Sequence, residues 1–343
     1  MATGTKVTGT REVSRLRRIF VRPEMASLMG LILVFSIFAI KAGSSGFLSP
    51  DGLAGILNVA AQFGIIGAPV TLLLINGDFD LSVGSTVGIT GMFLAIAVAD
   101  WGWPLWMAVV GALAIGLVVG VINGTLVTRT GIPSFIVTLA AMFTVRGFTI
   151  GFATAAVATP SVGGLEPFTD NNPVAFMFSG QVIGLFRMEI AWWLGLSILC
   201  WYLLTRTQLG NWIYGIGGGI LAARELGVPV ARVKVTLFAI TALSAAVLAI
   251  SQVTEVGGAD AQRGVGKEFE AAITAVIGGT LLTGGLGSPL GTVLGALTLA
   301  VVQQGLYFAG VDASWYQFVL GFILLAAVLL NRYVLRKATE SRA

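Results

Sequence analysis

Long apolar stretches separated by short polar connections dominate this chain. A helix needs about 20 apolar residues to cross a hydrocarbon core roughly 30 Å thick. Besides nine longer stretches, the chain has a short apolar stretch rich in glycine, 270–284, which either spans or re-enters the membrane. Counting it, the pattern predicts an all-α polytopic membrane protein with about ten transmembrane helices. The longer stretches are 26–41, 53–75, 81–99, 105–128, 132–152, 190–205, 235–256, 289–309 and 315–334.

Composition supports the same class of protein. The 343 residues are 56% hydrophobic and 10% charged, with a mean hydropathy of +0.92, whereas a soluble domain carries about 25% charged residues. The net charge of +4 comes from basic residues beside the apolar stretches. That placement indicates a lipid bilayer as the partner and argues against nucleic acid.

The distribution of Lys and Arg predicts the orientation in the membrane. With the N-terminus inside and ten spans, the inside segments hold 15 of the 20 basic residues, while Lys41, Arg187, Arg263 and Lys267 lie outside. This asymmetry follows the positive-inside rule, and a nine-span arrangement fits it less well. Both termini are therefore expected in the cytoplasm. The chain then divides into a basic cytoplasmic tail (1–25), a transmembrane permease domain (26–334) and a cytoplasmic tail (335–343).

Two segments outside the predicted spans are long enough to carry structure of their own. The outer one, 153–189, includes the mildly apolar "PVAFMFSGQVIGLF", which predicts a short helix lying on the outer surface. The inner one, 206–234, reads "RTQLGNWIYGIGGGILAARELGVPVARVK" and is rich in glycine and basic residues.

Two carboxylates, Asp78 and Asp80, interrupt the apolar run 53–99. As one helix this run would be on the order of 70 Å long, so it must break, and "NGDFD" supplies turn-forming residues. An aspartate in mid-span would cost roughly 2.5–3.5 kcal/mol, a cost that largely disappears at a helix start. We interpret the pair as architectural, with Asp80 capping a helix that begins at Leu81, in preference to a substrate, proton or metal site.

Glycines recur at intervals of three or four residues in several of the spans. Small residues at this spacing let helix backbones approach closely, so we expect them at helix–helix contacts. Any compact helical membrane protein can use this pattern, which therefore says little about function. The glycines concerned are Gly84, Gly88, Gly116, Gly120, Gly124, Gly287, Gly291 and Gly295.

The residues that commonly carry catalysis or bind metals are scarce. The chain has no histidine and a single cysteine, Cys200, within an apolar stretch. Imidazole chemistry, His-based metal sites and internal disulfides are therefore excluded. No phosphate-binding P-loop motif is present, so energy from ATP must come from a partner. We expect no catalytic residues, no metal site and no cofactor bound by this chain.

Four segments resemble the permease subunits of bacterial ABC importers for monosaccharides, of the ribose, xylose and autoinducer type. They are "GDFDLSVGS" (77–85), "NGTLVTRTGIPSFIVTLAAMFTVRG" (123–147), "GNWIYGIGGGILAARELGVPVARVK" (210–234) and "FEAAITAVIGGTLLTGGLGSPLGTVLGAL" (269–297). The resemblance implies a permease in the bacterial inner membrane that works with a second permease subunit, identical or paralogous. It also implies a cytoplasmic ATP-binding subunit that holds ATP and Mg, and a periplasmic sugar-binding protein.

In such permeases an inner loop docks on the ATPase, and "LAARELG" matches that loop here. Ala222 and Ala223 take the paired alanine positions, and Gly227 takes the position of a glycine that lets the chain turn away. Leu221 departs from the family pattern, which usually has glutamate there. The expected docking residues are Gly219, Leu221, Ala222, Ala223, Arg224, Glu225 and Gly227.

Polar residues within the spans are candidates for lining a sugar path, although a hydrogen bond to a neighbouring helix is the favoured interpretation of each. Arg146 is the costliest charge within a span, and we expect it either to snorkel or to pair with an acid on a neighbouring helix. The alternative function is an ion-coupled secondary transporter. Such a transporter would need acidic residues arranged around broken helices within the membrane. The path candidates are Asn58, Gln62, Asn76, Asp80, Asn123, Glu270 and Gln303.

Overall fold

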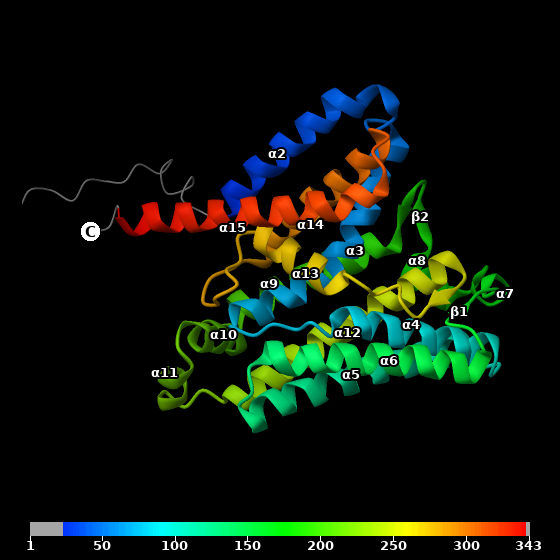
Figure 1. Cartoon of the computed structure of the whole chain (residues 1–343), viewed down its shortest axis with the longest axis horizontal. Helices are drawn as coiled ribbons and strands as arrows, with labels where there is room; N and C mark the ends of the chain where they lie inside the picture. Colours follow the sequence, from blue (N-terminus) through cyan, green and yellow to red (C-terminus); the bar gives the residue numbers. More distant parts are fainter. Residues whose placement is uncertain (1–22, 341–343) are drawn as a thin grey trace, which may run out of the picture.

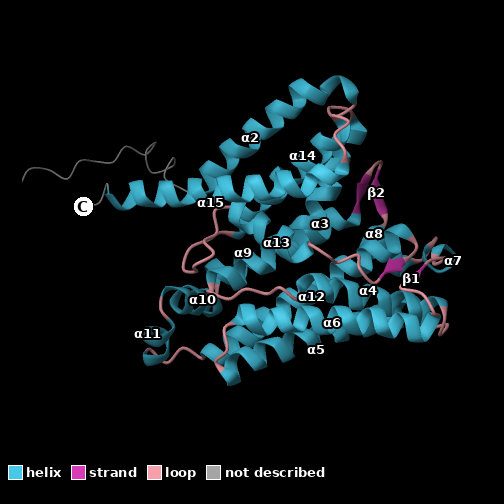
Figure 2. Ribbon diagram, viewed as in Figure 1, coloured by secondary structure: helices cyan, strands magenta, loops and turns pink. Residues whose placement is uncertain are grey.

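The computed structural model describes residues 23–340, so the predicted basic tail lies almost wholly outside the described residues. Helices make up nearly all of the described chain, apart from two short antiparallel ribbons, β1–β4 and β2–β3 (Figure 2). The prediction of a helical polytopic membrane protein is confirmed. The count of ten spans and the cytoplasmic termini stay predictions. Below, "inner" and "outer" refer to the sides that the basic residues predict.

Seven described helices are long and apolar enough to cross a membrane. Two shorter apolar helical segments accompany them: α4 (Val83–Ala99), and residues 313–329, which comprise η2 and the first part of α15. The seven are α2 (Pro23–Ala42), α3 (Pro50–Ile75), α5 (Leu105–Thr130), α6 (Ser134–Val157), α9 (Met188–Arg206), α12 (Val230–Val256) and α14 (Pro289–Phe308).

The connecting elements are short. Apart from α15 (Tyr316–Glu340) and the 11-residue helix α13 (Lys267–Ile277), they lie in the loops between the longer helices. The short helix predicted within 173–186 is confirmed by α8, and its place on the outer surface stays a prediction. These elements are η1 (Gly43–Ser45), β1 (Ser161–Val162), α7 (Glu166–Thr169), α8 (Pro173–Ser179), β2 (Gln181–Ile183), β3 (Phe186–Arg187), α10 (Gln208–Gly218), α11 (Ile220–Glu225), β4 (Ala259–Asp260) and η2 (Ala313–Trp315).

Two helices form the centre of the bundle. In their most apolar 18-residue windows, 78% of α3 and 72% of α12 are buried, against 22% of α6. Helix α12 packs against α3, α4 and α5, and α3 packs against α9, α13 and α14. Helices α5 and α6 lie along one edge of the molecule, and α2 and α15 lie along the opposite edge (Figure 1). The peripheral helices therefore present apolar side chains outward, as a lipid environment requires.

Glycines of α5 meet the backbone of α12. A Cβ atom at Gly120 would lie 2.5 Å from the carbonyl oxygen of Phe238, and one at Gly124 would lie 2.6 Å from the Cα of Val235. A Cβ at Gly116 would lie 3.0 Å from the carbonyl oxygen of Ala242. Any larger residue at these positions would force the two helices apart, which is how small residues act in membrane helix packing.

The other glycines singled out above contact loops and helix ends. Gly88 of α4 faces the Ala261 carbonyl, and Gly291 and Gly295 of α14 face the carbonyls of Gly278 and Thr274. A Cβ at Gly287 would lie 2.7 Å from side-chain atoms of Ile75 and Thr280, while Gly84 faces Glu268 and Gly264. Backbone that is not helical is therefore packed directly against helices in these places.

The break between α3 and α4 differs from the prediction. Helix α4 begins at Val83, not at Leu81, and Asp80 does not cap it. Instead, Asp80 Oδ1 accepts hydrogen bonds from the backbone N–H and the hydroxyl of Ser82. The backbone N–H of Leu81 donates to Thr138 Oγ1 on α6. Residues 79–81 are therefore not part of a helix, because their hydrogen bonds go to α6 or to side chains.

The glycine-rich stretch 270–284 is not one helix. Helix α13 ends at Ile277 and an irregular loop follows, in which Gly279, Gly284 and Gly285 have φ values of +90°, +86° and +79°. The Gly285 N–H donates to the carbonyl of Ile75 at the end of α3 (2.8 Å). Non-helical backbone is tolerated at membrane depth only where protein covers it, and α3, α10 and α14 supply that cover.

Candidate functional site

The inner connection presents an apolar tip. Helix α11 carries Leu221, which is 72% exposed, and Leu226 directly after the helix is 84% exposed. Gly227 follows with φ +78°, a left-handed conformation that favours glycine and turns the chain back toward α12. Leu221, the residue that departs from the family pattern, is thus one of two exposed leucines in this connection.

The two alanines of this connection differ in environment. Ala222 is exposed, but Ala223 is buried in an apolar cluster with Ile213, Ile216 and Val230. Ala223 therefore holds α11 against its own chain and is not free to contact a partner. Arg224 and Glu225 are exposed like Ala222, so the surface open to a partner combines a small residue, two charged residues and the two leucines.

A polar pocket of about 460 Å³ lies under α11. Its lining includes Arg224 of α11, Lys234 of α12 and Asp78 of the link between α3 and α4. Lys234 Nζ lies 2.7 Å from Asp78 Oδ1, and Asn76 Nδ2 donates to Asp78 Oδ2 (2.6 Å). A lysine on α12 therefore neutralises the carboxylate at the break, which allows it to be buried.

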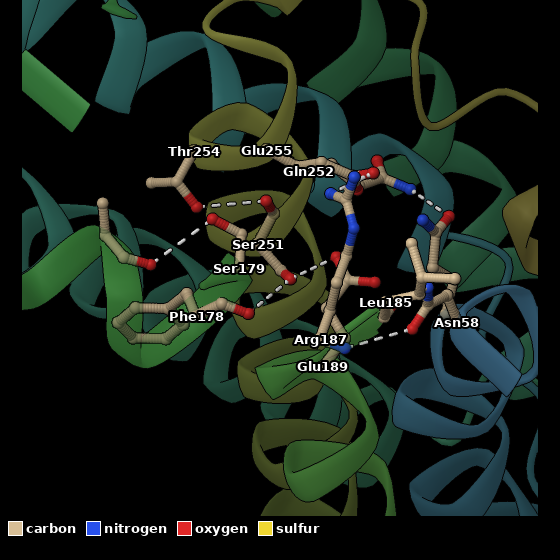
Figure 3. Close-up of polar contacts among 12 residues, drawn as sticks. Asn58, Phe178, Ser179, Leu185, Arg187, Glu189, Ser251, Gln252, Thr254 and Glu255 are labelled. Carbon is tan, nitrogen blue, oxygen red and sulfur yellow. Dashed lines mark hydrogen bonds and ion pairs between the residues drawn. The ribbon is translucent and has the colours of Figure 1, made fainter. Parts of the chain in front are cut away.

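A second polar network fastens the outer connection to the bundle (Figure 3). Glu189 at the start of α9 is fully buried, and the Ser251 hydroxyl of α12 lies 2.5 Å from its Oε1. Arg187 forms an ion pair with Glu255 (2.5 Å). On the α3 side, Asn58 donates to the Leu185 carbonyl and accepts from the Arg187 N–H. The hairpin β2–β3 is thus tied to both central helices.

Two polar contacts lie deeper between the spans. Asn123 of α5 donates through Nδ2 to the Ser82 hydroxyl (2.8 Å), next to the Asp80 carboxylate. Arg146 of α6 forms an ion pair with Glu268 of α13, with 3.3 Å between Nη2 and Oε1. Of the two outcomes expected for Arg146, the structure shows pairing with an acid.

The predicted path residues do not meet in one cavity. Asn58 lies at the outer hairpin, and Gln62 accepts a hydrogen bond from Gln252 (3.1 Å). Glu270 pairs with Lys267 one turn away on α13 (2.6 Å), and Gln303 is exposed on α14. Asn76 and Asp80 lie in the link between α3 and α4, and Asn123 of α5 bonds to Ser82 in the same link. Most of these side chains therefore bond to neighbouring elements, as the alternative to a role in the sugar path predicted.

Sequence reasoning missed Glu189 and Glu268 as buried acids. Glu189 ends the outer segment 153–189, and Glu268 precedes the apolar stretch 270–284, so both stand at positions where carboxylates are usually solvated. The signal available was their position directly beside long apolar stretches, but their partners lie 62 and 122 residues away in the chain. Within residues 23–340, no cluster of three or more His, Cys, Asp or Glu side chains could hold a metal ion.

Comparison with known proteins identifies relatives over nearly the whole chain. The profile of the family described as "Branched-chain amino acid transport system / permease component" matches residues 52–328. The ribose import permease protein RbsC of Escherichia coli K12 is 31% identical, covering 92% of this chain and 96% of its own length. The xylose transport system permease protein XylH of the same strain is 29% identical (91% and 92%). The fructose import permease protein FruG of Bifidobacterium longum is also 29% identical (97% of both chains).

Proposed function

Since this chain belongs to the family of branched-chain amino acid transport system permease components, we propose that it translocates a monosaccharide across the bacterial inner membrane. The chain is a multi-pass inner-membrane permease without ATPase activity of its own. One observation carries the choice of substrate class: the relatives described above are permeases for ribose, xylose and fructose, and they align over almost their full lengths.

The energy for transport would come from a separate subunit that docks on the inner connection. The exposed Leu221 and Leu226 support this assignment, because uncovered leucines beside a glycine-enforced turn suit insertion into an apolar groove. Arg224 and Glu225 beside them are free to pair with charges on that subunit. ATP and Mg would then be bound by the ATPase and not by this chain.

The complete importer would also contain a second permease subunit, identical or paralogous, and a periplasmic sugar-binding protein. The outer connection supports the latter, because the Arg187, Glu189 and Asn58 contacts hold it rigid enough to present a fixed docking surface. Both termini of the chain would face the cytoplasm.

A second substrate class, branched-chain amino acids, is favoured by the description of the matching family. The family also includes sugar permeases, so its name does not choose between the two classes. An ion-coupled mechanism finds less support, because two of the four buried acids in the described chain, Asp78 and Glu268, pair with cations and would give up a counter-charge to bind an ion.

Reconstituted transport tests the proposal. The permease is placed in proteoliposomes with its ATPase and binding protein, and uptake of ribose, xylose, fructose and leucine is measured with and without ATP. We expect ATP-dependent uptake of at least one sugar and none of leucine. Uptake driven by a proton or sodium gradient without the ATPase would contradict the mechanism, and uptake of leucine alone would contradict the substrate class.

A further inference from the structure

Arg146 lies at mid-depth of a membrane-spanning helix. It is 12 residues from Ser134 and 11 from Val157, the two ends of α6, which places it about 18 Å and about 16 Å from them at 1.5 Å per residue. Long basic side chains reach the membrane surface only from positions near helix ends. The guanidinium of Arg146 is therefore held at the level of the hydrocarbon core.

The ion pair with Glu268 covers the arginine only in part. The Arg146 side chain is 22% exposed, whereas that of Glu268 is 2% exposed. Gly84 of α4 packs against the Glu268 carboxylate, where a Cβ atom would collide with it. The Glu268 carboxylate is thus held in place by its surroundings, and the Arg146 side chain is the partly exposed member of the pair.

The strip of α6 beside Arg146 is uncovered by the rest of the chain. Phe143 is exposed, and a Cβ atom built on Gly147 or Gly151 would meet no atom within 4 Å. This contrasts with Gly116, Gly120 and Gly124 of α5, which are packed against α12. Helix α6 itself packs mainly on α4 and α5, and it lies along one edge of the molecule (Figure 1).

Hydrocarbon suits the exposed Phe143 and Phe148 of α6, but it does not suit the open part of the Arg146 side chain. A partly open arginine at the centre of a span costs several kcal/mol against hydrocarbon, so intramembrane charges face a bundle interior or a water-filled cavity. The Arg146 guanidinium therefore requires water or a polar solute next to it.

The chemistry of the pair matches a polyhydroxyl solute. A guanidinium carries five N–H donors. Arg146 donates through Nη2 to Glu268 Oε1, while Glu268 Oε2 has no hydrogen-bond partner among the described residues. Sugar hydroxyls accept hydrogen bonds from such donors. A carboxylate would form a stronger charge-assisted pair with the guanidinium, which would slow release from a conduit that must bind weakly.

We propose that Arg146 lines the solute path at the bilayer midplane and hydrogen-bonds the hydroxyl groups of the passing sugar, with Glu268 as its positioning residue. This assignment rests on the proposed function for the identity of the solute. It adds a specificity-determining residue that was not among the polar path candidates, and it explains why a costly charge is kept in the middle of α6.

Neutral variants of Arg146 and Glu268, made singly and together, distinguish a contact with the solute from an ion pair that only stabilises the fold. Uptake is measured with the complete importer carrying R146Q, E268Q or R146Q/E268Q. We expect R146Q to lower uptake at least tenfold and the double variant to recover protein yield and thermal midpoint, because no unpaired buried acid remains. Uptake by the double variant should stay at least tenfold low. Recovery of uptake in that variant would overturn the proposal, and R129Q at the exposed inner end of α5 serves as the control that keeps full uptake.

Water access tests the position of the path without any substrate. In a Cys200→Ala background, Gly147→Cys on α6 is compared with Val118→Cys, an exposed position at similar depth on α5. We expect a charged methanethiosulfonate reagent to modify Gly147→Cys at least tenfold faster. Equal, slow modification of both would overturn the path assignment. Fast modification supports it even if the wild-type importer takes up no sugar, so failure of the proposed function is distinguishable.

Discussion

The two long connections of this permease are fastened in opposite ways. The outer one, between α6 and α9, is tied by the buried Glu189, the Arg187–Glu255 ion pair and the Asn58 hydrogen bonds. The inner one, between α9 and α12, rests on small buried residues such as Ala223 and leaves two leucines uncovered. A segment held by specific polar contacts is suited to a fixed position, whereas one with uncovered apolar residues is suited to binding another protein.

The anchor on the inner side lies beneath the connection and not within it. The Asp78–Lys234 ion pair joins the break after α3 to the start of α12, with both side chains largely buried. Leu221 and Leu226 can therefore bind a partner, because the stability of the inner side depends on the ion pair and not on these two side chains. Three measurements on the free energy of unfolding sharpen this division, from the largest expected effect to the smallest.

Lys234→Met should have the largest effect. It leaves the buried Asp78 carboxylate without its cation, and breaking a buried pair on one side costs about 3–5 kcal/mol. The thermal midpoint of the detergent-solubilised permease measures the loss. The double change Lys234→Met with Asp78→Asn should recover most of it. A midpoint equal to that of the wild type in the single variant would show that the pair does not anchor the inner side.

Ser251→Ala should have an intermediate effect on the outer side. Glu189 Oε1 then loses its 2.5 Å contact while remaining buried, and an unsatisfied buried polar group costs about 1–3 kcal/mol. Ser179→Ala is the matched control in the same network, because the Ser179 hydroxyl bonds only within its own short helix, to Ala175. If the two variants unfold at the same temperature, the outer connection is not held by Glu189.

The pair Leu221→Asp and Leu226→Asp should change stability least, by under about 0.5 kcal/mol, because both side chains are exposed. The same double variant should reduce copurification of the ATPase subunit at least tenfold. Ile183→Asp, an exposed apolar position on the outer hairpin, is the control that leaves copurification intact. Retention of the ATPase by the inner double variant would remove the docking role from α11.

Several features followed from the sequence because they depend on local pattern. The helices α3, α5 and α14 fall where apolar stretches of membrane-spanning length predict them, and Gly227 adopts the left-handed turn expected of glycine after α11. The start of α4 was placed two residues early. Propensity favours a cap at Asp80, but hydrogen bonds from residues 79 and 81 to α6 override it.

The sequence by itself determined the class of this protein, because a chain with so few charges and such long apolar stretches can satisfy its backbone only as membrane helices. Its resemblance to sugar permeases was also readable from contiguous segments. Only the tertiary structure decided which charges neutralise one another. Asp78 and Lys234 are 156 residues apart, and Arg146 and Glu268 are 122 apart. No local pattern encodes these pairs. The first depends on how α12 packs beside the break after α3, and the second on how α6 packs beside the short helix α13.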